Sequence, residues 1–259
     1  MSAARTPAKV QPLDQVRNDW TRLGAEDPLW AVLIRPGTRH GRWDPAEFLA
    51  TGRDEVDTAL AHLRALDALP RLDRALDFGC GAGRASQALA LHASAVVGVD
   101  VSAPMLEAAR RLDRSAGRCT FVLNERPDLS RFDDASFDLV YSSLVLQHLP
   151  PALARSYLAE LARVLRPGGA MAVQVATRPT VSVKGALFRY APQPLLRFGQ
   201  QRILGYPAPM RMHPMSTNDF QQAIGRYDGR LLDTVEDTTY GGHWVYHRHF
   251  ARRAERDAG

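Results

Sequence analysis

Glycines alternate with small residues in a short segment that follows an apolar run. The segment from Asp77 to Gly83 reads DFGCGAG, and a helix-forming stretch follows it from Arg84. Glycine lets a backbone turn tightly between a strand and a helix and approach a ligand closely, because no Cβ intervenes. The next apolar run ends at Asp100, whose carboxylate is suited to accept hydrogen bonds from both hydroxyls of a ribose. These residues predict a site for a nucleoside.

The spacing of the glycines distinguishes between classes of nucleoside-binding site. The dinucleotide fingerprint is Gly-x-Gly-x-x-Gly/Ala. Counting from Gly79 puts Arg84 at its last position, and counting from Gly81 puts Ser86 there. The spacing therefore disfavours a nicotinamide-dependent reductase.

Short apolar runs alternate with helical segments from residue 74 onward. Strands are expected at residues 75–78, 95–100, 120–124, 137–141, 170–176, 230–238 and 243–251, with helices at 84–92, 103–112 and 151–165. Such alternation implies right-handed crossovers and a mostly parallel sheet that is covered on both faces. The last two strands, joined at Gly241-Gly242, form an antiparallel hairpin at the edge. We expect an α/β fold with a Rossmann-like, doubly wound, seven-stranded sheet.

Two segments outside this alternation are expected to surround the ligand. Residues 1–70 predict a helical lid: Val16 and Trp20 share a helical face, and a longer helix over 47–66 begins near Asp44-Pro45. Residues 27–41 are expected to form a loop. Residues 71–259 then form the ligand-binding domain, with a proline-rich cap inserted at about 177–228.

The combined motifs resemble those of class I S-adenosylmethionine-dependent methyltransferases. The resemblance rests on an acid two residues before three alternating glycines, on Asp100, and on the segments 136–148 and 163–169, and it covers roughly residues 74–176. It implies S-adenosyl-L-methionine as cofactor and S-adenosyl-L-homocysteine as product. The cofactor-binding residues that it implies are Asp77, Gly79, Cys80, Gly81, Gly83, Arg84, Asp100, Val101, Met105, Asn124 and Ser142. The stretch 124–127 (NERP) departs from the Asp-Ala pair frequent in the family, which leaves the adenine contacts open.

Histidine is the expected general base for such a reaction. His148 follows the fourth expected strand by a few residues, at the ligand-binding end of the sheet, and the family often carries a histidine there. The competing interpretation is a core histidine with both ring nitrogens satisfied. Trp30, Gln147 and His213 are the candidate substrate contacts, and His40 and His243 are further loop histidines.

Composition limits the remaining possibilities. The two cysteines, Cys80 and Cys119, are too few for a disulfide framework and stand outside any metal-ligand spacing, so we expect no metal. The few cysteines and the lack of an apolar signal-peptide run predict a cytoplasmic protein. The absence of an apolar stretch long enough to span a bilayer predicts a soluble one.

The net charge is +5, and nearly all of the positive side chains are arginines. Nucleic acid is nevertheless an unlikely partner, because a nucleic-acid site would show positive side chains clustered on one face with interleaved aromatics. Residues 161–218 contain no Asp or Glu but several arginines and Lys184. This basic stretch makes an anionic or carrier-bound acceptor one candidate.

The sequence thus predicts methyl transfer to a small molecule, at oxygen or nitrogen, in secondary metabolism. The alternative is a protein of the same fold that uses the bound cofactor for other chemistry, or that acts as a regulatory or scaffold module. The acceptor and the oligomeric state stay open.

Overall fold

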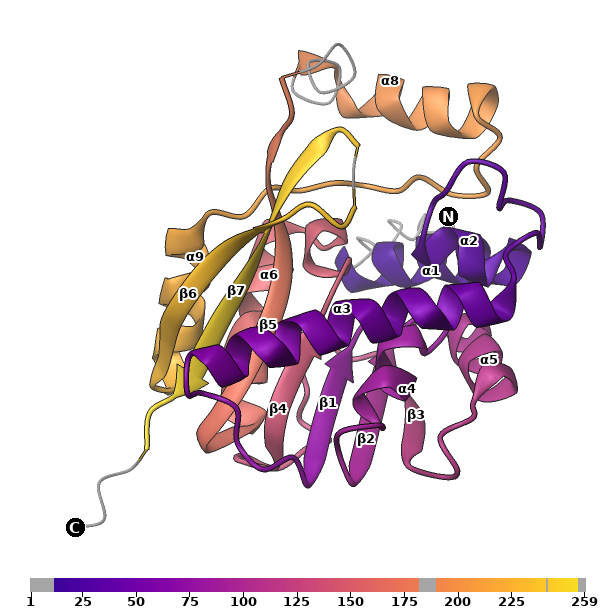
Figure 1. The fold of residues 1–259 in the computed structure, drawn as a ribbon. Coiled ribbons are helices and arrows are strands. Elements are labelled where there is room, and N and C mark those ends of the chain that lie inside the picture. The colour runs from indigo at the N-terminus through magenta and orange to yellow at the C-terminus, as the bar shows by residue number, and fades with distance from the viewer. Residues whose placement is uncertain (1–11, 182–189, 241, 256–259) are drawn as a thin grey trace, which may run out of the picture.

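The computed structural model describes residues 12–181, 190–240 and 242–255. Its centre is a sheet of seven strands in the order β3-β2-β1-β4-β5-β7-β6 (Figure 1). The strands are β1 (Arg74–Phe78), β2 (Ala95–Asp100), β3 (Cys119–Leu123), β4 (Phe137–Ser142), β5 (Leu165–Pro179), β6 (Gly229–Asp237) and β7 (Trp244–Arg253). β7 runs antiparallel to both of its neighbours, β5 and β6, and the pairs formed by the first five strands are parallel. The predicted fold class is confirmed, including the antiparallel hairpin at the edge.

The first strand, β1, lies in the interior of the sheet between β2 and β4, and this strand order determines where a ligand can bind. From β1 the chain proceeds outward to β2 and β3, and then returns to the other side of β1 at β4. The reversal makes the carboxyl ends of β1 and β4 the switch point of the sheet, where α/β proteins of this topology bind their ligands.

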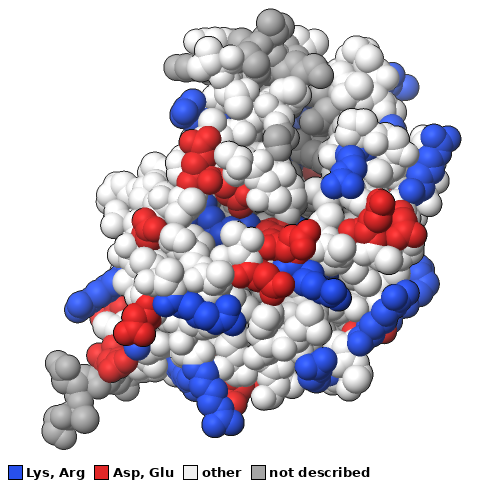
Figure 2. All heavy atoms as spheres, viewed as in Figure 1, with Lys and Arg blue, Asp and Glu red and all other residues white. Residues whose placement is uncertain are grey.

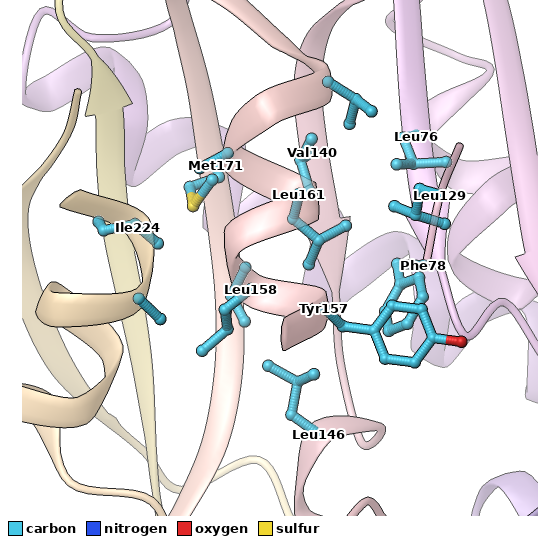
Figure 3. Close-up of a cluster of buried hydrophobic side chains, with 14 of the residues drawn as sticks. Leu76, Phe78, Leu129, Val140, Leu146, Tyr157, Leu158, Leu161, Met171 and Ile224 are labelled. Atoms are coloured by element: carbon cyan, nitrogen blue, oxygen red, sulfur yellow. The ribbon is translucent and has the colours of Figure 1, made fainter. Parts of the chain in front are cut away.

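Helices cover both faces of the sheet. On one face α3 (Pro45–Ala65) and α4 (Arg84–Leu89) bury a cluster that includes Leu60, Leu63 and Leu89, and α5 (Ala103–Leu112) lies beside them (Figure 1). On the other face α6 (Pro151–Val164) places Leu158 and Leu161 over the sheet, as Figure 3 shows. Both sheet faces are thus apolar, which explains why the central strands read as continuous apolar runs.

Local capping chemistry sets the helix starts. Asp44 accepts a hydrogen bond from the Glu47 amide at 2.9 Å, with Pro45 as the first helical residue, so α3 begins where the sequence predicts. The same arrangement at Asp27 and Pro28 starts a short helix, α2 (Pro28–Val32), which corrects the expectation of a loop over 27–41. Ahead of it, α1 (Pro12–Glu26) crosses the carboxyl end of the sheet (Figure 1).

The expected cap over 177–228 divides into two described parts, and its residues 182–189 lie outside the described residues. The helical segments α8 (Gln193–Phe198) and η2 (Gly199–Ile203) stand beyond the carboxyl end of the sheet (Figure 1). By contrast, α9 (Thr217–Ile224) and the turn η3 (Gly225–Tyr227) pack on the domain itself, because Phe220 and Ile224 join its core. Figure 3 shows Ile224 beside α6. The segment from 217 onward therefore belongs to the sheet-covering layer.

Candidate functional site

A cavity lies at the carboxyl ends of β1, β2 and β4, on the side where α1 and α2 cross the sheet (Figure 1). Its wall is mostly apolar, with a few polar groups. The lining residues are Leu13, Val16, Trp20, Val32, Phe78, Gly79, Gly81, Val99, Asp100, Val101, Met105, Asn124, Ser143, Leu144, Val145, His148, Leu149 and Tyr157. A concave apolar site with few polar groups is the usual form of a small-molecule pocket.

The glycine loop forms one wall of this cavity. Gly79, Gly81 and Gly83 have φ angles of +75°, +50° and +81°, a backbone conformation that residues other than glycine rarely adopt. A Cβ on Gly79 would lie 2.2 Å from a methyl carbon of Val145, and one on Gly81 would lie 2.7 Å from a methyl carbon of Val32. The turn after β4 and helix α2 thus press directly on the loop, and only glycine fits.

Asp100, the last residue of β2, connects this loop to α5. One carboxylate oxygen accepts a hydrogen bond from the Gly81 amide at 2.9 Å, and the other accepts one from the Ser102 amide at 2.9 Å. Burial raises the pKa of the Asp100 carboxyl, against the lowering effect of these amide donors. Each carboxylate oxygen retains a second lone pair. The side chain can therefore accept two further hydrogen bonds from a ligand in the cavity.

Four of the expected cofactor residues on β1 and the start of α4 lie behind the cavity wall. Asp77 is 2 % exposed and accepts a hydrogen bond from the Ser86 hydroxyl at 2.6 Å. Burial raises the pKa of Asp77 to about 7. Arg84 turns away and pairs with Glu55 at 2.7 Å, while Cys80 is buried and Gly83 starts α4. None of the four contributes to the lining.

Ser142 also lies inside the sheet. It is fully buried, and its hydroxyl donates to the Phe78 carbonyl at 2.9 Å. The next two residues, Ser143 and Leu144, line the cavity instead. Leu144 has a φ angle of +61°, a conformation that a branched residue seldom adopts outside functional sites.

The residues expected near an adenine gather on one side. Val101, Met105 and Asn124 all line the cavity next to Asp100. The Asn124 amide group donates to the Arg126 and Asp128 carbonyls at 3.1 and 2.9 Å. This side chain therefore holds the loop after β3, which is the part of the chain that departs from the family pattern.

His148 ends the short helix η1 (Leu146–His148) and faces the cavity. Its Nδ1 lies 2.7 Å from the Arg211 carbonyl, and its ring packs edge-on against Trp20 with centroids 5.0 Å apart. A carbonyl can only accept, so Nδ1 carries the proton and Nε2 keeps a lone pair. Burial lowers the pKa of His148 to about 4. The ring is therefore neutral near pH 7 and retains the nitrogen lone pair that a base requires.

The three expected substrate residues do not line the cavity. Trp30 packs edge-on against Tyr206 at 4.9 Å. Gln147 is buried, and its main-chain carbonyl accepts a hydrogen bond from the His213 main-chain amide at 2.7 Å. His40, in the loop between α2 and α3, and His243, directly before β7, are likewise outside the lining. Leu13, Val16 and Trp20 of α1 occupy the wall instead, and the helical spacing of Val16 and Trp20 was the signal for them.

Two findings concern the described residues as a whole. Within the described parts of the chain, no group of three or more His, Cys, Asp or Glu side chains is arranged to hold a metal ion. No helix among the described residues is long and apolar enough to cross a bilayer.

The comparison with protein families gives a match over the central part of the chain. Residues 76–173 match the family described as "Methyltransferase domain". This range contains the glycine loop, Asp100 and His148. Over this range the chain is similar to a methyltransferase domain.

Curated relatives share this methyltransferase domain. A demethylmenaquinone methyltransferase of Clavibacter sepedonicus is 36% identical over 146 residues, covering 56% of this chain and 54% of the relative. A 2-methyl-6-phytyl-1,4-hydroquinone methyltransferase of Synechocystis is 31% identical over 172 residues, covering 65% and 53%. The chain thus spans about half the length of these relatives.

A solved structure extends the similarity of fold over nearly all of the chain. Magnesium protoporphyrin IX methyltransferase of Synechocystis, crystallised with S-adenosylmethionine, superposes with a TM-score of 0.64 at 20% identity. The superposition covers 96% of this chain and 100% of that one. The N-terminal helices and the segment over 177–228 are therefore within the compared fold.

Proposed function

We propose that the chain transfers a methyl group from S-adenosyl-L-methionine to a small-molecule acceptor, at oxygen or nitrogen. The observation that carries the proposal is the position of Asp100 at the cavity wall, where its carboxylate can accept two more hydrogen bonds. Beside it lies a glycine loop in which no side chain would fit at Gly79 or Gly81. Solved structures of similar fold contain the cofactor or its product. The remaining acceptor capacity of Asp100 fits the two ribose hydroxyls of this nucleoside.

The proposal assigns a role to each group of lining residues. Asp100 accepts hydrogen bonds from the ribose, Val101 and Met105 flank the adenine, and the backbone of Gly79 and Gly81 contacts the amino-acid part. When bound, the cofactor supplies a methyl group that its own sulfonium charge activates. The protein's contribution is then alignment in a cavity from which water is excluded.

His148 is proposed as the general base. Its protonated Nδ1 is held by the Arg211 carbonyl, so Nε2 can accept the proton that an acceptor hydroxyl or amine loses on methylation. Trp20 fixes the ring from the α1 side. A pKa near 4 makes His148 a weak base, but one that is fully deprotonated across the physiological range.

The wall opposite the cofactor residues favours an acceptor with an apolar body. Leu13, Val16, Trp20 and Leu149 supply it. The basic stretch offers less to an anionic acceptor than its sequence implies, because several of its arginines already pair with carboxylates from elsewhere in the chain. These pairs are Arg163 with Asp134 and Glu160, Arg166 with Asp138, and Arg211 with Asp19. The quinone and hydroquinone methyltransferases among the relatives agree with an apolar acceptor.

Calorimetric titration with S-adenosylhomocysteine tests the cofactor assignment. We expect the wild type to bind it and Asp100→Asn to weaken binding by about tenfold to a hundredfold, because hydrogen bonds to a charged group are lost. Asp138→Asn is the matched control. It also removes a buried carboxylate, but one that accepts the Asp73 and Arg74 amides at the opposite end of the sheet. A wild type that does not bind, or an Asp100→Asn variant that binds equally well, would contradict the assignment.

Formation of S-adenosylhomocysteine from the cofactor, across a panel of quinols, phenols and hydroxy acids, tests the transfer. With an active acceptor, His148→Gln should lower kcat by about a hundredfold or more and change KM little. A wild type that binds the cofactor but transfers to no member of the panel would favour the regulatory alternative instead.

A further inference from the structure

A buried cluster of four charged side chains lies behind the cavity, on the face of the sheet that α3 covers. Glu55 of α3 pairs with Arg84 at 2.7 Å and with Arg248 of β7 at 2.6 Å, and Arg248 also pairs with Asp237 at 2.8 Å. All four side chains are between 2 % and 7 % exposed. Two carboxylates thus balance two guanidinium groups, and the cluster as a whole is neutral.

Glu55 is the centre of this cluster. Besides both arginines, it accepts hydrogen bonds from the hydroxyls of Tyr141, at 2.6 Å, and Tyr240. Burial would raise the pKa of Glu55, but the charges of Arg84 and Arg248 hold it well below its usual range. The carboxylate is therefore ionised near neutral pH, and arginine does not lose its charge in proteins.

The cluster reaches both walls of the cavity. On one side, Arg84 directly follows the last glycine of the loop. On the other, Gln174 of β5 donates to Asp237 at 2.8 Å, and its side-chain carbonyl accepts the Leu144 amide at 3.1 Å. Leu144 is the cavity residue with the left-handed backbone. A continuous chain of hydrogen bonds thus connects the glycine loop with the turn after β4.

The distance between the cluster and the cavity is small. Arg248 lies 3.5 Å from the Ser143 hydroxyl, and Ser143 itself lines the cavity. A single side chain therefore separates the cluster from the space assigned to the cofactor. Any net charge in the cluster acts on the ligand through protein rather than through water, where screening is weak.

We propose that Glu55 is a positioning residue of the cofactor site, which holds the glycine loop and the Ser143–Val145 turn in place and keeps the charge behind them neutral. The inference rests on the proposed function. If Glu55 loses its charge, the cluster keeps two arginines and one acid, Asp237, so one positive charge remains buried beside the cavity. Outside the cluster, Arg84 also interacts with Asp77, the acid whose pKa burial raises to about 7. S-adenosylmethionine carries a positive sulfur and S-adenosylhomocysteine a neutral one. The uncompensated charge should therefore weaken binding of the cofactor more than that of the product.

The ratio of the two dissociation constants measures this effect. For charges about 10 Å apart at an effective dielectric constant of about 20, Glu55→Gln should raise Kd for S-adenosylmethionine relative to S-adenosylhomocysteine on the order of tenfold. Glu55→Asp keeps the charge but shortens the side chain, so it should weaken both ligands equally and leave the ratio unchanged. A merely structural role would not distinguish the two ligands.

Asp138→Asn is again the matched control, because it should destabilise the fold while changing neither dissociation constant. Asp237→Asn creates the same net charge at a more accessible position, so it serves if Glu55→Gln does not fold. A ratio that stays at its wild-type value in the folded Glu55→Gln or Asp237→Asn variant would overturn the inference. Failure of the wild type to bind S-adenosylhomocysteine would instead overturn the proposed function.

Discussion

Replacing Gly79 with alanine should destabilise the protein by about 3 kcal/mol, and the structure divides this cost into two parts. The left-handed backbone, with φ of +75°, costs a non-glycine residue about 1–2 kcal/mol. The new Cβ would also lie 2.2 and 2.6 Å from the two methyl carbons of Val145. Rotation of Val145 about its side-chain bond cannot move both methyl groups away, so the backbone must shift, at about 1–3 kcal/mol.

Gly117 provides a control that isolates the backbone part. Its φ angle is +82°, but a Cβ there would meet no atom within 4 Å. Gly117→Ala should therefore cost only about 1 kcal/mol. In a second comparison, Val145→Ala removes both clashing methyl carbons and leaves the Val145 Cβ at 3.0 Å. The double variant Gly79→Ala/Val145→Ala should then show a favourable coupling of about 1–2 kcal/mol.

Urea denaturation measures all four variants, because a change in midpoint at constant slope reports stability. Titration with S-adenosylhomocysteine on the same proteins should show weaker binding for Gly79→Ala and unchanged binding for Gly117→Ala. The reasoning is refuted if Gly79→Ala is no less stable than Gly117→Ala, or if Val145→Ala does not restore stability to it.

Three further substitutions test other features of the site and the fold. Asp77→Asn removes a buried carboxyl whose pKa is raised to about 7. Its stability relative to the wild type should rise between pH 4 and pH 7, by about 3 kcal/mol in denaturation curves. His249→Asn removes a buried ring whose pKa is lowered to about 4, so the loss of stability between pH 6.5 and pH 4 should become smaller. Arg253→Ala frees the carbonyls at the end of α6 and should cost about 3 kcal/mol, whereas the half-exposed Arg252→Ala should cost less than about 1 kcal/mol.

The secondary structure was most predictable where local chemistry determines it. The limits of β2 and α5 agree with the sequence prediction, since Ser102 and Pro104 mark the helix start. Helix α2 carries the same Asp-Pro start as α3 but has only five residues, too few for an apolar period to show. Strand β3 begins one residue earlier than expected. It is an edge strand whose half-exposed residues leave a weak pattern.

The sequence motif predicts the position of the glycine loop, but it does not by itself predict the direction of the side chains next to the loop. Successive residues of a strand point to opposite faces. Phe78 lines the cavity, so Asp77 must face α4, where its carboxylate accepts a hydrogen bond from the Ser86 hydroxyl. The same alternation puts Ser142 inside the sheet and Ser143 at the cavity. A motif thus locates the backbone of a site, and the strand period then decides which of its side chains can reach a ligand.

The parts of the site that depend on distant residues were beyond prediction. An amphipathic pattern places the charged residues of α3 on its solvent side. Glu55 is instead buried against the sheet, and its burial is tolerable only because Arg84 and Arg248 meet it there. Arg248 lies 193 residues away in the sequence, and no local pattern connects the two. A buried charge is defined by its partners, so its role emerges only once the fold has brought them together.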